Sequence, residues 1–336
     1  MRRSFADDPT LSAALFDLLE AVFPGIGQSA EHARSLGAAW ESVSTPFLAF
    51  EEGRPVSHVG IIELPLVLLG REVTAGSIHA VATHPKARRR GHYRRLMDEA
   101  RSYAVSRYET LVLTTEHPEY FEPFGFRVIR EHLFTLRCPS PGGGDRLDPS
   151  GDGGARAMDH DGLRRVDDGW MRGMDGGGVR AMDHSGVPAM GHGGLRSINT
   201  QDPKDVALLH RLLETREPVS RVVGVVREKA IFCFNEGRRP LHYVEDLDVM
   251  VSMERKGARL TLFDVVGPKL PSLDALLARI PDPVEEVAFC FATDRFTKDA
   301  TATSQVFDHD GPSYLMAHGP FAAEAEAFTL PRSART

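Results

Sequence analysis

Glycine divides this chain of 336 residues, because 16 of its 31 glycines fall between residues 142 and 194. In that stretch an eight-residue unit recurs, for example as ARAMDHDG, MRGMDGGG and VRAMDHSG. A unit so rich in Gly and Asp buries too little apolar surface to offset the entropy of ordering it. We therefore predict a flexible Gly/Asp-rich octapeptide-repeat linker over 139–194, between one domain over 1–138 and another over 195–336.

The histidines of this repeat, His160, His184 and His192, raise the alternative of a metal-binding array. They stand eight to 24 residues apart, and no cysteine lies beside them. Metal sites in proteins use closer and more regular ligand spacings. We therefore predict that the protein uses no metal.

The overall composition limits the classes of partner and of compartment. A formal net charge of −7 disfavours general binding to nucleic acids or to membrane surfaces. The three cysteines are far apart and odd in number, which is typical of reduced thiols in the cytoplasm. The first residues contain no unbroken apolar stretch, and no run of about 20 apolar residues occurs anywhere. We therefore expect a cytoplasmic protein without a signal peptide or a transmembrane helix.

Both predicted domains show an alternation of helix and strand patterns. In the first, apolar spacing and turn residues predict helices over 11–23 and from residue 91, and strands over 47–51, 58–67, 77–84, 110–115 and 127–135. In the second, they predict helices over 205–214 and 272–280, and strands over 241–244, 247–253, 260–266 and 286–291. The predicted fold class is α/β (α+β), with sheets flanked by helices.

The segment THPKARRRGHYRR places six Lys or Arg within ten residues, with no acid among them. The run follows an apolar strand, and Gly91 opens the next helix. Backbone N–H groups in the first turn of a helix lack intrahelical partners, and the helix dipole adds partial positive charge there. The side chains of Arg88, Arg89 and Arg90 supply forked donors that suit phosphate oxygens. The segment therefore predicts a cradle for a phosphate or diphosphate group.

Two other interpretations of the basic run are a solvated helix face and a nucleic-acid patch. The first is disfavoured by the preceding strand, by the glycine at the helix start and by the lack of acids for pairing. The second is disfavoured by the acidity of the whole chain. The segment also lacks the GxxxxGK[ST] pattern of P-loops and the GxGxxG pattern of dinucleotide-binding folds.

The same segment resembles the acetyl-CoA-binding motif of the GNAT N-acetyltransferases, Arg/Gln-x-x-Gly-x-Gly/Ala, with Arg88, Gly91 and Tyr93 at its three defined positions. Tyr93 departs from the small residue that is usual at the third position. YFEPFGFRVIREH resembles a later family segment, in which an aromatic residue is followed four residues on by Gly-Phe. The resemblance covers residues 1 to about 137. The tandem arrangement is similar to that of the Eis-like acetyltransferases, without their sterol-carrier-like domain.

The resemblance implies a GNAT fold, whose mixed central sheet has its fourth and fifth strands splayed apart to admit the pantetheine arm of acetyl-CoA. Backbone groups of Val81 and Thr83 would pair with that arm, and amides from Arg89 through Arg94 would hold the pyrophosphate. It also implies a second, degenerate GNAT-like domain that lacks the pyrophosphate loop and shapes the acceptor pocket. The cofactor-binding residues implied in this way are Val81, Thr83, Arg88, Arg89, Arg90, Gly91, His92, Tyr93 and Arg94.

The catalytic acid and base follow less directly from the resemblance. Family members usually protonate the departing thiolate with a tyrosine four residues before the glycine of the Gly-Phe pair. Counted back from Gly125, that position is Phe121, so the adjacent Tyr120 is the candidate acid. Glu116, at the end of the strand over 110–115, is the candidate base. The alternatives for the base are Glu63, His79, His84 and the carboxylate of Thr336, because in Eis-like proteins the chain end reaches the active site.

Together, the residues and the resemblance predict an acetyl-CoA-dependent N-acetyltransferase. Its acceptor would be a primary amine of a small molecule or a peptide, which attacks directly in a ternary complex. The alternatives are a non-catalytic acyl-CoA-binding or sensor protein and other acyl-CoA chemistry on the same fold. We expect no nucleic-acid or membrane partner, and the sequence leaves open whether the protein is a homo-oligomer.

Overall fold

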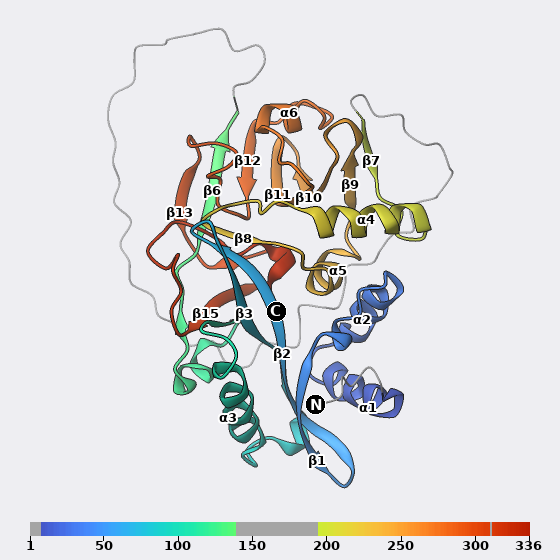
Figure 1. Cartoon of the computed structure of the whole chain (residues 1–336), viewed down its shortest axis with the longest axis vertical. Helices are drawn as coiled ribbons and strands as arrows, with labels where there is room; N and C mark the ends of the chain where they lie inside the picture. The colour runs from blue at the N-terminus through green and yellow to red at the C-terminus, as the bar shows by residue number, and fades with distance from the viewer. Residues whose placement is uncertain (1–7, 139–193, 310) are drawn as a thin grey trace. The chain divides into compact units, whose positions relative to one another are not determined.

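The computed structural model describes residues 8–138, 194–309 and 311–336, which belong to one compact unit (Figure 1). The predicted linker, apart from residue 194, and its three histidines lie outside the described residues. The domain boundaries at 138 and 194 therefore stay predictions. Within the described ranges, no helix combines the length and the hydropathy that crossing a lipid bilayer requires.

The first sheet is built around a long antiparallel hairpin of β2 and β3. Its strand order is β1-β2-β3-β4-β15-β14, and in addition β5 pairs with β15 and β8 pairs with β2. The pair of β3 and β4 is parallel, because helix α3 crosses over between them. The strands are β1 Thr45–Glu51, β2 Arg54–Leu68, β3 Arg71–Thr83, β4 Leu111–Thr115, β5 Arg127–Val128, β8 Val223–Val225, β14 Phe307–Asp308 and β15 Pro312–His318.

Helices cover both faces of the first sheet. Helix α3 (His92–Val105) packs on one face, and its buried stripe of Leu96, Met97, Ala100 and Ala104 matches the predicted apolar spacing. Helices α1 (Pro9–Glu20) and α2 (Ile26–Ser35) lie on the opposite side of β2 and β3 from α3 (Figure 1). Helix α1 starts at Asp8, whose carboxylate accepts a hydrogen bond from the Leu11 amide.

The second sheet repeats the same plan with different residues. Its strand order is β13-β6-β12-β11-β10-β9-β7, with β11 and β12 parallel and joined through helix α6 (Leu273–Leu277). Helices α4 (Pro203–Thr215) and α5 (Ala230–Glu236) belong to the same half. The strands are β6 His132–Arg137, β7 Leu195–Ser197, β9 Leu241–Val244, β10 Val249–Lys256, β11 Arg259–Val266, β12 Glu286–Phe289 and β13 Thr301–Ser304.

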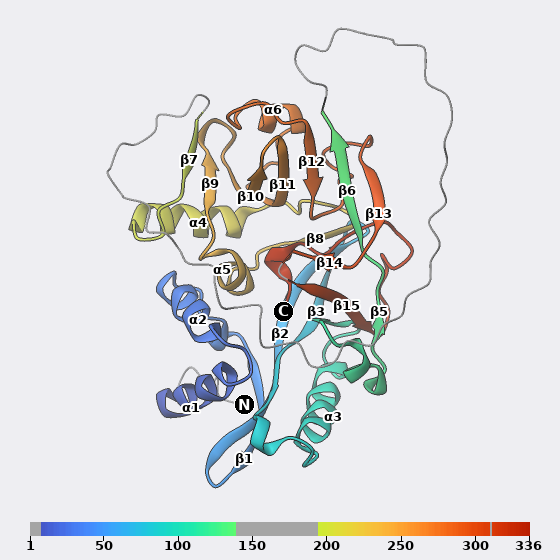
Figure 2. The same cartoon turned by 180° about the vertical axis from the view of Figure 1, so that it is seen from behind.

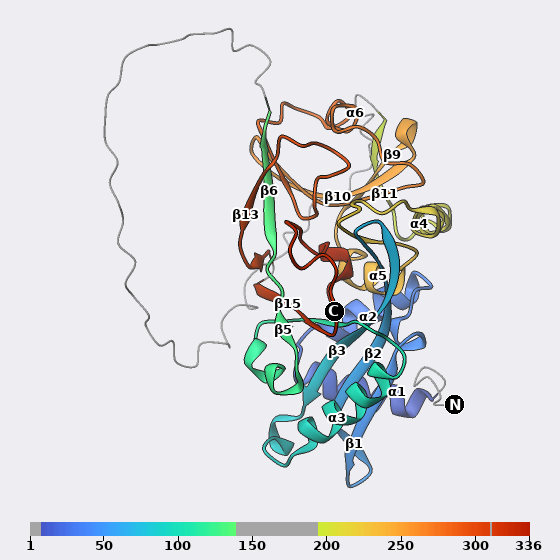
Figure 3. The same cartoon turned by 60° about the vertical axis from the view of Figure 1, so that its left-hand side comes forward.

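Each sheet contains strands from the other half of the sequence, namely β8, β14 and β15 in the first sheet and β6 in the second (Figures 2 and 3). Strand β15 lies antiparallel to β4, with Leu315 opposite Thr114. Strand β6 lies antiparallel to β12, with Phe134 opposite Phe289. In both sheets the guest strand follows the second strand of the parallel pair. The two halves are therefore joined by exchanged backbone hydrogen bonds as well as by side-chain packing.

The single strand predicted over 127–135 is wrong, because the structure has two strands there in different sheets. Strand β5 pairs with β15 of the first sheet, and β6 pairs with β12 and β13 of the second. The break between them falls at residues 129–131. The buried Glu131 carboxylate accepts hydrogen bonds from Arg335, which holds the chain at the crossing between the two sheets.

Candidate functional site

The loop between β3 and α3 contains two residues in the left-handed region of backbone conformation. After the short 3-10 turn Pro85–Ala87, Arg89 has φ +63° and Gly91 has φ +82°. Gly91 is the residue that precedes α3, and no side chain caps the helix there. The N–H groups of the first helical turn are therefore without intrahelical or capping partners. Backbone turned in this way exposes N–H groups that can hold an anion.

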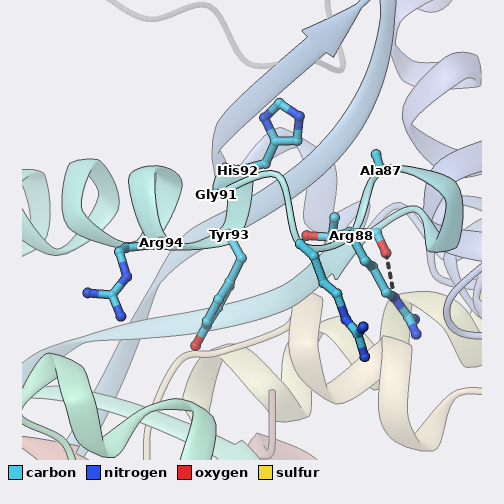
Figure 4. A pocket seen from close by; sticks show the side chains of 8 residues that line it. Ala87, Arg88, Gly91, His92, Tyr93 and Arg94 are labelled. Carbon is cyan, nitrogen blue, oxygen red and sulfur yellow. Dashed lines mark hydrogen bonds between the residues drawn. The ribbon is translucent and has the colours of Figure 1, made fainter.

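The loop and the start of α3 line a hollow of about 230 Å³ (Figure 4). Three arginines contribute to its lining, and no carboxylate does. Together with the helix dipole, these arginines give the hollow a positive potential that suits phosphate groups. The residues that line it are Thr83, Ala87, Arg88, Arg89, Gly91, His92, Tyr93 and Arg94.

The side chains of the residues predicted to form the phosphate cradle point in different directions. In Figure 4 the side chains of Arg88 and Tyr93 point to one side of the loop and the imidazole of His92 points to the other. Nε of Arg88 donates to the Thr83 carbonyl (3.3 Å).

Arg90 is not among the residues that line the hollow. Its guanidinium donates to Glu51 (2.7 Å), and Nε2 of His92 lies 2.8 Å from the same carboxylate. The hydrogen bond to His92, with Arg90 adding to it, lowers the pKa of Glu51. The anchoring role of Glu51 has no signal in the sequence, because it lies 39 residues before Arg90.

The contacts of the Tyr93 side chain show why a large residue is accommodated where the motif usually has a small one. Its hydroxyl donates to the Tyr120 carbonyl (2.6 Å), and its ring packs edge-on against Phe121 and Phe124. Burial raises the pKa of the Tyr93 hydroxyl, which therefore stays protonated as a donor. Tyr93 thus ties the start of α3 to the turn that carries the candidate acid.

Strands β3 and β4 are paired over a short length only, at Gly76 with Leu111 and Ser77 with Val112. Beyond Ser77, β3 continues to Thr83 without further pairs to β4 among the described residues. These two strands, predicted over 77–84 and 110–115, take the place that the resemblance gives to the fourth and fifth strands of the GNAT fold. Val81 and Thr83 lie on the unpaired stretch, and Thr83 reaches the hollow.

A β-bulge interrupts β3 on this unpaired stretch. The register with β2 shifts between His58 and Gly60, and Ala80 has φ +49°. A left-handed residue with a Cβ is unusual in a strand and re-aims the backbone around it. The bulge was not foreseen, since alanine carries no sequence signal for positive φ.

The gap between β3 and β4 is bridged at its inner end by Thr336. Its hydroxyl lies 2.6 Å from the Ser77 hydroxyl, and its main-chain oxygen accepts a hydrogen bond from the Thr114 hydroxyl (2.6 Å). Figures 1 and 2 show this end of the chain beside β2 and β3. The preceding residue, Arg335, is held by the buried Glu131. Thr336, one of the alternative candidates for the base, therefore lies where the two strands diverge.

Tyr120 and Phe121 lie in the turn after β4 with opposite exposures. The Tyr120 side chain is 55% exposed and its ring packs against His117, whereas Phe121 is 7% exposed and belongs to the apolar core under α3. The residue at the usual tyrosine position is thus a core residue, and the neighbouring tyrosine faces solvent.

The candidate bases lie in different environments. Glu116 is exposed just beyond the end of β4. His79 is buried, its Nε2 lies 2.8 Å from the Ser44 hydroxyl, and desolvation lowers its pKa to about 3. Glu63 accepts a hydrogen bond from Tyr108, and Nδ1 of His84 accepts one from the Lys86 amide. Each of these two candidate bases is therefore already engaged in one hydrogen bond.

In the described ranges, no three or more His, Cys, Asp or Glu side chains are grouped so that they could hold a metal ion. All three cysteines are free.

Residues 10–129 match the family of acetyltransferase (GNAT) domains. This segment of the chain is a GNAT acetyltransferase domain. The match begins in α1, covers α2, strands β1 to β4, the basic loop and α3, and ends one residue after β5. The GNAT assignment drawn from the basic motif and the Gly-Phe segment is therefore confirmed.

Solved structures resemble a larger part of the chain than this domain. A probable N-acyltransferase from Enterococcus faecalis V583 is similar over 91% of this chain and 69% of its own, with 15% identity and a TM-score of 0.50. Eis1 from Mycobacterium abscessus is similar over 85% and 71%, with 12% identity and a TM-score of 0.43. A GNAT acetyltransferase from Brucella melitensis, solved with acetyl-CoA, is similar over 35% and 78%, with 20% identity and a TM-score of 0.30. The likeness to the Enterococcus structure supports the predicted GNAT fold across both sheets.

Proposed function

We propose that the protein is an acetyl-CoA-dependent N-acetyltransferase that moves an acetyl group to a primary amine by direct attack in a ternary complex. The observation that carries this proposal is the arginine-lined hollow at the uncapped start of α3, which opens beside the unpaired stretch of β3. The GNAT domain family makes acyl-CoA the expected occupant of such a hollow.

The hollow fits the diphosphate of coenzyme A. Amides from Arg89 through Arg94 would hold it, with charge from the side chains of Arg88, Arg89 and Arg94. Arg90 and His92 would contribute through their backbone only, because Glu51 holds their side chains. Val81 and Thr83 would pair with the pantetheine arm along β3.

Bound acetyl-CoA supplies an activated acetyl group, and a neutral amine attacks it directly. The Val81 N–H is the donor that would hold the thioester carbonyl and stabilise the negative charge that develops on its oxygen. Tyr120 would protonate the departing thiolate, and Glu116 would take the proton from the amine. A thiol of ordinary pKa, about 8–9, is a good leaving group, so the demand on the acid is small.

The acceptor would approach from the side of Thr336, where the second half of the chain meets the first sheet. We assign residues 195–336 the shaping of that pocket for a small-molecule or peptide amine. A cytoplasmic location and the absence of nucleic-acid and membrane partners complete the proposal.

A second candidate is a non-catalytic acyl-CoA-binding or sensor protein. The observation that favours it is the buried Phe121, which stands where relatives carry a proton-donating tyrosine. Acetyl-CoA binding is common to both candidates, so only turnover separates them.

The test is a thiol-release assay with acetyl-CoA and a panel of amines, with mass spectrometry of the products. Release of CoA together with an amine heavier by one acetyl group supports the transferase. Binding of acetyl-CoA without release on any amine supports the sensor. The variant Tyr120→Phe then tests the acid, and we expect it to lower kcat while KM for acetyl-CoA stays near the wild-type value.

A further inference from the structure

His58 is a buried histidine in β2 that the proposed chemistry does not use. Its side chain is fully buried, and Nδ1 lies 2.7 Å from the Ala80 carbonyl oxygen. A carbonyl only accepts hydrogen bonds, so Nδ1 carries the proton. Nε2 is buried with no hydrogen-bond partner in the described part of the chain. The bond to Ala80 is therefore the one polar contact that fixes the ring.

The carbonyl that His58 holds belongs to the bulge of β3. Ala80 has φ +49°, a conformation that a Cβ disfavours, so a neighbouring interaction must maintain it. Across the bulge, the His79 ring occupies the space above Gly60 that a Cβ would fill. The bulge is thus supported from β2 at two neighbouring positions, His58 and Gly60.

The orientation of one peptide group follows from this bond. The described chain contains no cis peptide bonds, and in a trans peptide the C=O and the following N–H point in opposite directions. The Ala80 carbonyl points toward His58 on β2. The N–H of Val81 therefore points away from β2, toward the side on which β4 diverges.

We propose that His58 is a positioning residue, whose bond to the Ala80 carbonyl aims the Val81 N–H at the thioester carbonyl. The inference rests on the proposed function, which places the thioester beside Val81. His58 touches neither substrate, so it acts only through the backbone. Desolvation lowers the pKa of His58 to about 4, so its imidazole is neutral at physiological pH.

The kinetic test compares His58→Leu, which removes the donor, with His58→Asn, whose amide can donate from a position similar to Nδ1. A misaimed donor should matter most in the transition state. We expect His58→Leu to lower kcat by about tenfold or more, with KM for acetyl-CoA changed less than about threefold. His58→Asn should recover part of the loss. Equal kcat values in the wild type and His58→Leu would overturn the proposal.

His210→Leu is the matched control, because Nε2 of His210 also holds a backbone carbonyl, that of Leu36, at 2.6 Å. We expect it to lower the melting temperature and to leave kcat unchanged. A second variant addresses the bulge itself. Glycine adopts positive φ without strain, so Ala80→Gly in the His58→Leu background should restore part of kcat. No gain from Ala80→Gly, together with no gain from His58→Asn, would also overturn the proposal.

A binding measurement keeps the inference separate from the transfer reaction. In ¹⁵N NMR spectra, acetyl-CoA should shift the Val81 amide more than CoA does, and His58→Leu should abolish that difference. If the wild type binds acetyl-CoA but releases no CoA, the transferase proposal fails and this difference still decides the role of His58. Equal shifts with both ligands overturn the inference, and no binding of acetyl-CoA overturns both.

Discussion

The two parallel crossovers of the molecule share a plan and differ in how their helices begin. In the first half, α3 starts at Gly91, with φ +82° and no capping side chain. In the second half, α6 starts at Ser272, whose hydroxyl accepts a hydrogen bond from the Ala275 amide. Pro268 and Pro271 precede it and have no N–H to offer. The backbone N–H groups at the start of α3 therefore remain available to an anion. At the start of α6, one N–H group is bonded to the serine cap and the two prolines have none.

This difference shows that the residues that form the strand–helix–strand connection are not the residues that we expect to bind an anion. The strand, helix and parallel-strand connection is present in both halves, and each sheet then accepts a strand from the other half. An apolar strand and an amphipathic helix suffice for that connection. We place the capacity for an anion in the few turn residues before the helix, where the first crossover has four basic residues and Gly91, and the second has two prolines, one lysine and a capping serine.

The largest effect on stability should come from removing the buried ion pair of Glu131 and Arg335, which joins the two halves of the chain. The Glu131 carboxylate is buried and accepts from Arg335, from the Thr329 hydroxyl and from the Leu330 amide. Glu131→Ala leaves Arg335 buried without its partner, and we expect the free energy of unfolding to fall by about 3–5 kcal/mol in urea titrations. Glu324→Ala removes the exposed pair with Arg127 and should cost about 1 kcal/mol or less. Equal losses in the two variants would contradict the structural role of the buried pair.

The next effect concerns the basic loop of the first crossover. Arg89→Glu places a carboxylate in the lining of the hollow, and we expect it to raise Kd for acetyl-CoA at least about tenfold in calorimetric titrations. Arg90→Gln is the control, since that side chain is paired with Glu51 outside the lining. Its Kd should stay within about threefold of the wild type. An unchanged Kd for Arg89→Glu would show that the hollow does not hold the phosphates.

A smaller effect is expected at the second crossover. Ser272→Ala removes the cap of α6 and should lower the free energy of unfolding by about 1 kcal/mol. We place the acetyl-CoA site at the first crossover, so Kd for acetyl-CoA should not change in this variant. A higher Kd for acetyl-CoA in Ser272→Ala would indicate that the second crossover also contributes to binding, and would contradict the distinction between the two crossovers.

The smallest effect per residue is a dependence of stability on pH. Burial lowers the pKa of His58 to about 4 and that of His79 to about 3, whereas both are near 6.5 in an unfolded chain. As pH falls from 7 to 6, the unfolded chain binds protons at these sites and the folded chain does not. Stability should therefore fall with pH, by about 0.5–1 kcal/mol per histidine over that step. Urea unfolding at the two pH values checks this, and His58→Asn should show a shallower dependence.

Features that depend on neighbouring residues could be predicted from the sequence, whereas contacts between distant segments could not. The apolar stripe of α3 and the strands predicted over 47–51, 58–67 and 110–115 follow from periodicity within a few residues, and the basic loop is visible in a single short segment. The pairing of β15 with β4 joins segments about 200 residues apart, and nothing in Pro312–His318 marks its partner. Likewise Glu51 and His58 act through contacts with distant residues, so their charge and position alone could not assign them a role.

The central claim, that the first crossover binds acetyl-CoA and the second does not, can be tested by hydrogen–deuterium exchange with mass spectrometry. The protein would be measured with and without saturating acetyl-CoA, and peptides over residues 84–95 and 267–277 would be compared. We predict slower exchange over 84–95 with acetyl-CoA and no change over 267–277. Protection over 267–277, or no protection over 84–95 when binding is saturated, would contradict the account.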